Sequence, residues 1–362
     1  MIFKKILLLF LLFLSIICCG QKSDSILSRK SLFLIPNASY QQETSVAIGL
    51  ALGYYFKSYQ IKRISSISGS ATYTFLNQFI FNITPKLFFG DKKWYLYTNL
   101  NYRNYPDYYY GISTNSTNLE QAYTAKIFSL NIQPQYAVAK NIYLGCLLNV
   151  RLENILVDST FNINKPKIES YGFAGWQAYK QTNFGAVVSY DSRDNQFYPT
   201  KGFFAKTILS ASISGWFSNY TAQGITLDIR QYFPVYKSHI LAWQALFSGV
   251  FSKSEIPFQL LPTLGGRDLM RGFRQGMYRE NGLFVLQTEY RLPIYKRLKG
   301  AVFCSAGDLF NQNACSSNKF KIAYGAGLRY RLNDARVHLR FDLAKNNYGD
   351  KLQIYITATE AF

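Results

Sequence analysis

Apolar and polar residues alternate along much of the chain, most clearly in its last third. In the segment 322–332 every second residue is apolar, and small or charged residues lie between them. The segments 284–292 and 337–343 repeat this pattern. Because successive side chains of a strand point to opposite faces, each segment predicts a strand with one oily face and one face of polar or small residues.

The lengths of the predicted strands favour a membrane barrel over a soluble β-sandwich, which would alternate as well. Many have about 11–14 residues, whereas globular strands centre near about 5–6 and tilted membrane strands need about 9–11. Aromatic residues cluster at strand ends, as in 54–56, 94–97 and 108–110. Such clusters form the interfacial girdles of membrane barrels, although cross-strand packing is an alternative explanation. We count about sixteen strands between Ser31 and Phe362, which predicts an all-β, transmembrane antiparallel β-barrel.

The N-terminus has the features of a secretory signal peptide. Lys4 and Lys5 precede an apolar run of about a dozen residues, which is too short to cross a bilayer as a helix. We therefore predict a signal peptide at 1–20, a short segment at 21–30 and the barrel domain at 31–362. Lipidation of Cys18 or Cys19 is the alternative, although the residues before them fit a lipidation site poorly.

The composition excludes several classes of protein. A chain with 17% aromatic residues is unlike a disordered protein. After the N-terminus, no apolar run reaches the roughly 18 residues of a transmembrane helix. The formal net charge of +20 falls to +18 when Lys4 and Lys5 are removed with the signal peptide. A basic lumen, or loops that contact anionic lipopolysaccharide, would explain this charge, because the basic residues follow no nucleic-acid-binding motif.

Catalysis and metal binding find little support in the sequence. His239 and His338 are its two histidines, no Gly-x-Ser-x-Gly elbow occurs, and no Cys/His cluster has ligand spacing. Cys304 and Cys315 pair across a hairpin or remain thiols, and we favour thiols because disulfides across adjacent strands are sterically demanding. We expect no enzyme activity, no cofactor and no metal.

The last predicted strand runs from Lys351 to Phe362 and ends at an aromatic residue. Alternation places Ile354, Ile356 and Phe362 on its oily face and Tyr355 on the other. Such a strand resembles the recognition signal by which outer-membrane barrels are handed to their assembly machine. We predict that Tyr355 and Phe362 belong to this signal.

Two segments carry more information than alternation. The first runs from Asp191 to Gly202, and the second from Leu264 to Gly276. Turn-forming residues dominate the first and glycines and arginines the second, so a strand connection and a flexible basic loop are the simplest interpretations. The distinctive residues are Asp191, Arg193, Asp194, Asn195, Pro199 and Gly202 in the first segment, and Gly265, Gly266, Arg271, Gly272 and Phe273 in the second.

In this order, before a terminal barrel strand, the two segments resemble the BamA/TamA superfamily of outer-membrane barrels, also called bacterial surface antigens. The resemblance covers nearly the whole chain after 1–20 and is strongest from Asp191 to Phe362. Arg271-Gly272-Phe273 matches the family's loop motif, although Met270 stands where Val or Ile is usual. The resemblance implies a sixteen-stranded barrel whose sixth extracellular loop folds back into the lumen.

A loop of this kind needs an acidic partner for Arg271 inside the barrel, because a buried arginine without a carboxylate is costly. Glu289 lies on the polar face of the next predicted strand and is the best candidate. Asp342, also on a polar face, is the second, and Asp308 is the third. A fork-shaped guanidinium binds carboxylates in a bidentate manner, which suits it for such a grip.

Two departures from the family pattern are expected. In relatives, acidic residues on the strand after that of Glu289 help to hold the arginine, but the corresponding Ser305 and Asn311 are neutral. Relatives also carry receptor (POTRA) or patatin-like lipase domains before the barrel, and we expect none in residues 21–30.

Two functions remain open at this stage. The first is an assembly or translocation barrel in the bacterial outer membrane, with a seam between its first and last strands that opens to a client strand. The second is a passive anion-favouring pore or structural barrel, with Arg329, Arg331 and Arg340 lining the lumen. The expected partners are outer-membrane lipids and lipopolysaccharide, with client outer-membrane proteins or a separate periplasmic partner, and no nucleic acid.

Overall fold

The computed structural model describes residues 30–41, 45–56, 63–75, 77–90, 93–112, 121–157, 174–311, 320–358 and 360–362. The predicted signal peptide, residues 21–29 and Cys315 lie outside the described residues. Cys304 is exposed on β15, and its pairing with Cys315 stays untested.

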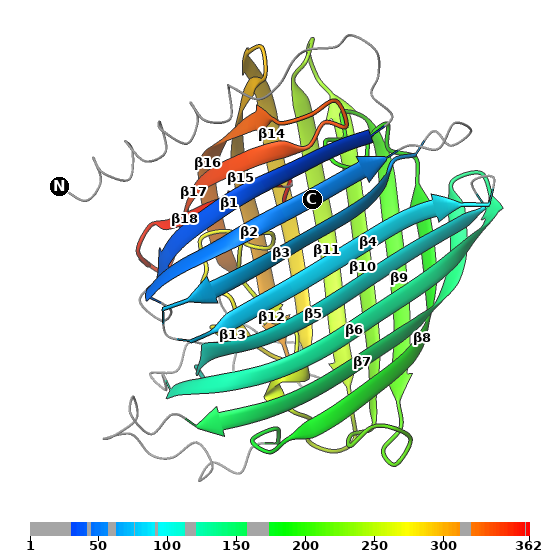
Figure 1. Cartoon of the computed structure of the whole chain (residues 1–362), viewed down its shortest axis with the longest axis vertical. Coiled ribbons are helices and arrows are strands. Elements are labelled where there is room, and N and C mark those ends of the chain that lie inside the picture. Colours follow the sequence, from blue (N-terminus) through cyan, green and yellow to red (C-terminus); the bar gives the residue numbers. More distant parts are fainter. Residues whose placement is uncertain are drawn as a thin grey trace.

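Within the described residues, sixteen strands form one antiparallel sheet, and each strand pairs with its neighbours in the sequence (Figure 1). A 3-10 helix, η2 (Phe258–Leu260), and a separate hairpin of β12 (Thr263–Leu264) and β13 (Tyr278–Arg279) lie in one connection. No helix in this part of the chain is long and apolar enough to cross a membrane. The strands of the large sheet are β1 (Lys30–Gln41), β2 (Ser45–Phe56), β3 (Ser65–Thr74), β4 (Phe79–Phe89), β5 (Trp94–Tyr109), β6 (Gln121–Ala139), β7 (Ile142–Val157), β8 (Tyr179–Asp191), β9 (Gly202–Ser212), β10 (Ala222–Pro234), β11 (Ile240–Phe251), β14 (Gly282–Tyr295), β15 (Leu298–Phe310), β16 (Lys321–Arg331), β17 (His338–Asn346) and β18 (Gln353–Thr357).

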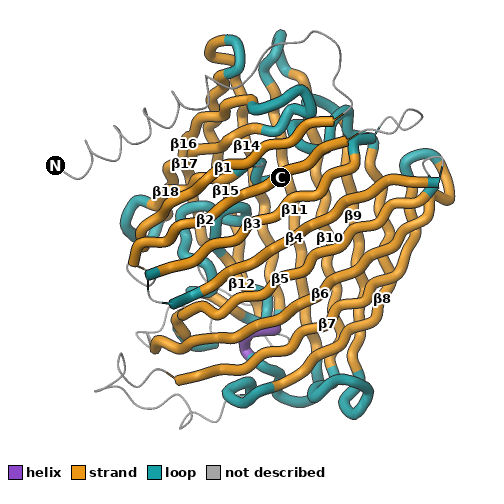
Figure 2. The backbone as a smooth tube through the Cα atoms, viewed as in Figure 1, coloured by secondary structure: helices purple, strands orange, loops and turns teal. Residues whose placement is uncertain are grey.

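The sheet curls into a barrel whose strands run obliquely around its wall (Figure 2). Phe33 and Ile35 of β1 pack in one cluster with Val337 and Leu339, which brings the first strand beside the end of the sheet. No ladder joins β18 to β1 among the described residues. The predicted all-β antiparallel barrel of about sixteen strands is confirmed, and the β-sandwich alternative is wrong.

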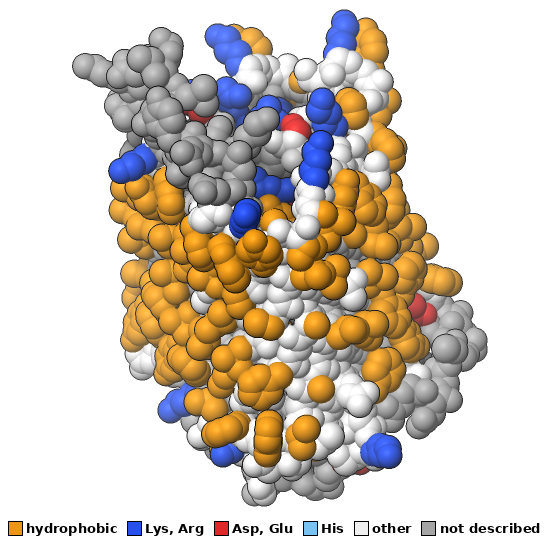
Figure 3. Space-filling model, turned by 90° about the vertical axis from the view of Figure 1, so that its right-hand side faces the viewer, with side chains coloured by type: hydrophobic (Ala, Val, Ile, Leu, Met, Phe, Trp, Pro, Cys, Tyr) orange, Lys and Arg blue, Asp and Glu red, His pale blue; other side chains and the backbone are white. Residues whose placement is uncertain are grey.

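Alternation separates an outer face from an inner face, as the sequence predicts. Phe284 and Leu286 of β14 are 44% and 45% exposed, whereas Val285, Glu289 and Arg291 of the same strand are fully buried. In Figure 3, hydrophobic side chains gather in a belt over the middle of the wall, and Lys and Arg lie mostly at its two ends. An outer apolar belt with charged ends is the surface that a bilayer requires of a β-barrel.

The connections between strands alternate between the two ends of the barrel. We call the end that carries residues 235–239 and 296–297 the turn rim. We call the end from which residues 252–281 enter the barrel the loop rim. The two sequence motifs lie at opposite ends, because the connection from Asp191 to Gly202 belongs to the turn rim.

Candidate functional site

Residues 252–281 form a loop that fills part of the barrel interior, and we call it the plug loop. The hairpin of β12 and β13 stiffens its middle, with Leu264 opposite Tyr278. Gly265 and Gly266 follow β12 with φ of +100° and +112°. At Gly265 a Cβ atom would lie 2.6 Å from the Arg274 carbonyl oxygen, so this turn requires glycine.

Arg271 holds the tip of the plug loop to the barrel wall. Its Nη2 lies 2.8 Å from Glu289 Oε2 and its Nη1 lies 2.6 Å from Asp342 Oδ2. Its guanidinium carbon lies 3.5 Å from the centre of the Phe303 ring. Arg271 is 1% exposed, and both carboxylates are fully buried. The structure therefore brings Arg271 together with both of its leading predicted partners.

Three further arginines surround the same two carboxylates. Arg291 Nε lies 2.7 Å from Glu289 Oε1, and Arg329 pairs with both Glu289 and Asp342. Arg340 pairs with Asp342, and also with Asp268 of the plug loop at 2.9 Å. Arg329 also lies 3.2 Å from Glu360. We call Arg271, Arg291, Arg329 and Arg340, together with Glu289, Asp342, Asp268 and Glu360, the arginine cluster.

The arginine cluster is balanced in charge, and its centre has almost no access to water. Its four arginines face four carboxylates, and the four arginines are each at most 1% exposed. Asp268 is the carboxylate of the cluster that reaches water, with a side chain that is 47% exposed. Breaking such a network at a buried member leaves an uncompensated charge, which costs far more than an exposed ion pair contributes. The plug loop is therefore expected to be either fully bound to the barrel wall or fully released, without a partly loosened state.

Gly272 and Phe273 continue the contact beside Arg271. The Gly272 amide donates to Tyr355 Oη at 3.1 Å, and Asn346 Nδ2 donates to the Gly272 carbonyl at 2.8 Å. A Cβ atom at Gly272 would lie 2.8 Å from the Lys345 carbonyl oxygen, so the loop approaches β17 backbone to backbone. The family motif therefore binds the last two strands of the sheet directly.

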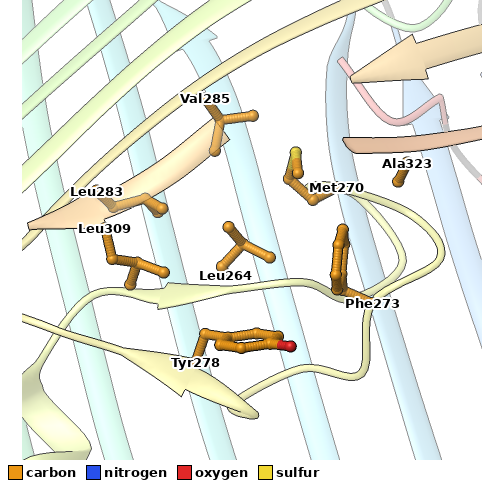
Figure 4. Close-up of a cluster of buried hydrophobic side chains, with 8 residues drawn as sticks. All are labelled: Leu264, Met270, Phe273, Tyr278, Leu283, Val285, Leu309 and Ala323. Atoms are coloured by element: carbon orange, nitrogen blue, oxygen red, sulfur yellow. The ribbon is translucent and has the colours of Figure 1, made fainter. Parts of the chain in front are cut away.

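A hydrophobic cluster seats the plug loop against β14, β15 and β16 (Figure 4). Phe273 is fully buried in it, and its ring meets that of Tyr278 edge to face. The loop contributes Leu264, Met270, Phe273 and Tyr278, and the wall contributes Leu283, Val285, Leu309 and Ala323.

The far part of the plug loop reaches a different wall. Phe258 of η2 is fully buried, and its ring centre lies 4.6 Å from that of Tyr109 on β5 and 5.7 Å from that of Tyr123 on β6. Arg279 lies over the Phe258 ring and donates to its carbonyl at 3.1 Å. The loop thus spans the interior from the β14–β17 wall to the β5–β6 wall. The sequence analysis did not identify Phe258 or Phe303 as site residues. Phe303 could have been found, because it lies two residues before Ser305 on the same strand and therefore faces the same side.

Asp308, the third predicted partner, does not contact Arg271, so its predicted role is wrong. It lies opposite Phe284 in the outward-facing row of β15 and pairs with Lys321 Nζ at 3.1 Å. The inward row of β15 contains Phe303 and Ser305 instead. A shift of one residue along a strand moves a side chain to the opposite face of the sheet. Asn311 lies 3.4 Å from Glu280, away from the arginine cluster.

The first motif, Asp191 to Gly202, folds as a hydrogen-bonded connection at the turn rim, and we call it the strap. Asp191 pairs with Arg63 and with Arg193, the latter at 2.9 Å. The Asn195 side chain accepts from the amides of Phe197 and Tyr198, both at 2.8 Å. Pro199 is buried. Gly202 has φ of +111°, and a Cβ atom there would lie 2.5 Å from the Ser192 carbonyl oxygen.

Asp194 closes the strap and ties it to another connection. It accepts hydrogen bonds from Thr200 and Lys201 and pairs with Arg336 at 2.8 Å. Burial raises the pKa of Asp194, but these hydrogen bonds outweigh burial and hold the pKa below its ordinary value. The carboxylate is therefore charged in the fold and binds the strap to the β16–β17 connection.

The strap extends across the barrel interior. Phe197 meets Tyr55 of β2 edge to face at 4.9 Å, and Asn195 donates to the Ala335 carbonyl between β16 and β17. In the strand order β2 lies six positions before β8, and β16 lies six positions after it. Tyr198 is fully buried, with Lys299 Nζ 3.7 Å from its ring centre. The strap thus occupies the turn rim as the plug loop occupies the other end.

The terminal strand differs from the prediction. β18 ends at Thr357 instead of Phe362, and the residues after it turn inward. Phe362 is 3% exposed and packs with Tyr232 and Ala242, and Arg291 donates to its main-chain oxygen at 3.1 Å. The C-terminus lies inside the outline of the barrel in Figure 1. The placement of Phe362 on the oily face is therefore wrong, and Tyr355 faces the plug loop.

Comparison with known families identifies the fold's relatives. A model of the Omp85 superfamily domain matches residues 62–362. The chain belongs to the Omp85 superfamily. The predicted resemblance to the BamA/TamA barrels is confirmed at this level. A search of curated proteins by sequence found no match.

Two solved structures show how the Omp85 fold is shared. BamA from Haemophilus ducreyi, in a form lacking POTRA domains 1–3, matches with a TM-score of 0.58 and 14% identity, over 91% of this chain and 69% of that one. CdiB from Acinetobacter baumannii matches with a TM-score of 0.55 and 13% identity, over 88% of this chain and 56% of that one. At such low identity these likenesses show the barrel fold alone.

Proposed function

We propose that this Omp85 barrel lies in the bacterial outer membrane and takes part in assembling or translocating outer-membrane proteins. Family membership and the resemblance of its two motifs support the proposal. The outer apolar belt supports a bilayer location, and outer-membrane lipids are then its immediate surroundings.

The observation that carries the proposal is the contact between the plug loop and the last strands. The Gly272 amide donates to Tyr355 on β18, the final strand of the sheet. β18 has only five residues, and within the described residues it has β17 as its one ladder partner. A strand edge of this kind accepts another strand by backbone hydrogen bonding. A client strand would add at the seam between β18 and β1, and the plug loop would control how far β18 can move.

The test is reconstitution of the barrel in liposomes with an unfolded client barrel. The wild type is expected to accelerate client insertion over empty liposomes. A variant whose seam is closed by a cysteine pair, one in β1 and one in β18, in a background with Cys146, Cys304 and Cys315 changed to Ser, is expected to lose the acceleration and regain it on reduction. Equal insertion rates with and without the protein would contradict the proposal.

A passive anion-favouring pore is the second candidate, favoured by two lysines that lie toward the turn rim of the barrel. Lys206 Nζ lies 2.6 Å from Gln133 Oε1 and 5.1 Å from the Tyr97 ring centre, and Lys86 lies over the same ring at 6.0 Å. Neither lysine forms an ion pair with a carboxylate within the described residues. Asp228 attracts Lys206, but Lys86 and Arg230 add positive charge beside it, so the site would favour anions. Steady anion-selective conductance without any effect on client insertion would favour this candidate.

A partner that delivers clients is part of the first proposal. A separate periplasmic protein would bind at the turn rim, where the strap lies. Pull-down with the intact barrel, compared with a strap variant, tests this.

A further inference from the structure

The outer wall of β5–β8 carries a groove of about 520 Å³ close to the loop rim. Tyr102, Phe128 and Leu152 line its apolar part, and they are 39%, 37% and 45% exposed. Lys126 and Lys180, both exposed, line it as well. The groove therefore combines an apolar floor with two ammonium groups. Glu153, the carboxylate of its lining, is buried and is bound by Arg151 and by the Tyr179 hydroxyl.

The two lysines lie where the apolar belt ends. Along the outward row of β6, Phe128 and the residues nearer the turn rim are apolar or aromatic, and Lys126 is the first charged residue toward the loop rim. Lys126 lies opposite Asn154 of β7, and Lys180 lies opposite Leu152 of the same strand. The two lysines are thus about 10 Å apart across the strands, at about 4.8 Å per strand, and two residues apart along them, so their Cα atoms are about 12 Å apart. Their flexible stems allow both ammonium groups to reach one phosphate between them.

A turn beside Lys180 presents large apolar side chains to the outside. Ile213, Trp216 and Phe217 are 59%, 68% and 72% exposed. Tryptophan prefers the level of lipid headgroups, where one side of its ring is apolar and the other is wet. An exposed apolar group of this size marks a contact surface.

This turn is held in one conformation against the wall. The Asn219 amide donates to the Lys180 carbonyl at 2.9 Å, the Lys180 amide donates to Asn219 Oδ1 at 2.8 Å, and Thr182 Oγ1 donates to the Phe217 carbonyl at 3.0 Å. Phe217 has φ of +54°, a left-handed conformation that costs energy for a residue with a Cβ atom. Beside Lys180 and Thr182, the turn takes the place of β9 as the neighbour of β8, because the β8–β9 ladder begins at Phe184. The aromatic side chains of the turn therefore have a fixed position beside the groove.

We propose that this region binds a phosphorylated glycolipid of the outer leaflet. Lys126 and Lys180 hold a phosphate by charge-assisted hydrogen bonds, and the acyl chains lie along Tyr102, Phe128 and Leu152. Trp216 and Phe217 enter the same leaflet beside it. The choice of leaflet rests on the proposed outer-membrane location, with the loop rim outward. A free phosphate would use the lysines but not the apolar floor.

The test uses the full barrel in detergent and three lipid probes. These are a bisphosphorylated, multiply acylated glucosamine disaccharide, its dephosphorylated counterpart and phosphatidylglycerol. Binding is measured by native mass spectrometry and by equilibrium titration. The variants are K126Q/K180Q and W216S/F217S. The control K237Q/K296Q removes two exposed lysines from the turn rim, each of which lies 5.0 Å over a tyrosine ring.

K126Q/K180Q is expected to bind the phosphorylated glycolipid about thirty-fold more weakly, or about 2 kcal/mol at 1.4 kcal/mol per tenfold. W216S/F217S is expected to weaken it as well, and K237Q/K296Q to stay within about twofold of the wild type. The dephosphorylated probe should bind the wild type as weakly as the phosphorylated one binds K126Q/K180Q. Equal weakening by the control, equal binding of both glycolipids, or displacement by an equal amount of phosphatidylglycerol would overturn the proposal. No client protein is present, so a failed insertion assay leaves this result unaffected.

Discussion

The plug loop and the strap occupy opposite ends of the same barrel, and both are held by arginine–carboxylate pairs, yet the two sets of pairs differ in their contact with water. At the plug loop, Arg271 and its two carboxylates are at most 1% exposed. At the strap, the Arg63 side chain is 21% exposed and that of Arg336 is 42% exposed.

This difference in exposure predicts different behaviour. A dry ionic cluster resists partial loosening, because every departing partner leaves a charge without solvent. A partly wet pair exchanges its partner for water at little cost and weakens in salt. We therefore expect the plug loop to stay fully bound or to leave the wall as a unit, and the strap to loosen gradually. The following variants are arranged from the largest expected effect to the smallest.

Arg271→Ala should destabilise the barrel most, by about 3–5 kcal/mol, because Glu289 and Asp342 lose a buried partner. The temperature of unfolding, followed by the heat-dependent gel shift, should fall accordingly. Arg267→Ala is the matched control, because Arg267 belongs to the same loop but its side chain is 70% exposed. Equal unfolding temperatures for the two variants would contradict the view that the buried ion pairs of the plug loop contribute more to stability than exposed ones.

Gly272→Ala should cost about 2–3 kcal/mol, because it adds a close contact with the Lys345 carbonyl to the strain of positive φ. Gly215→Ala has the strain of positive φ without the close contact. Gly215 has φ of +87°, and apart from its own chain neighbours no described residue lies within 4 Å of the place that a Cβ atom would take. The difference between the two unfolding temperatures measures the close approach of loop and wall. No difference would mean that the loop tip moves away from β17 without loss.

Tyr198→Leu should cost about 1–2 kcal/mol, because the strap loses a buried ring beneath Lys299 and Arg291. Tyr236→Leu is the control, since Tyr236 also carries a lysine over its ring but is 60% exposed. Denaturant unfolding of both variants gives the comparison. A larger loss for the exposed site would contradict the account of the strap.

Arg336→Gln should have the smallest effect, about 0.2–1 kcal/mol, because its pair with Asp194 is partly exposed. The pKa of Asp194 is lower in the fold than in the unfolded chain, where it is about 3.9. Its contribution is therefore full above that unfolded value and is lost as the pH falls through the lower folded pKa. The difference between wild type and variant should vanish in acid and shrink in high salt. A difference that persists in acid would show that Arg336 acts through another contact.

The sequence predicts the faces of the barrel better than the paths of its connections. Alternation locates Glu289 and Asp342 on the inner face, and a buried Arg271 requires such carboxylates, so this part of the site follows from residue types and period. The same parity argues against Asp308, which falls in the row opposite to Phe303.

The paths taken beyond the strand ends follow no such period. Phe362 continues the alternation of β18 in sequence, but the chain leaves the sheet after Thr357 and buries the ring against Tyr232. The residues of the strap predict a turn, because Asp194 and Asn195 are turn formers, and nothing local shows that Phe197 reaches β2. These contacts join residues more than a hundred positions apart and depend on the closed barrel.

Hydrogen–deuterium exchange of the Arg271→Ala variant tests most directly whether the plug loop holds the last strands. We predict faster exchange than in the wild type for amides of β17 and β18, with little change in β6 and β7. Unchanged exchange in β17 and β18, or a uniform increase around the whole barrel, would contradict a plug loop that locks the end of the sheet.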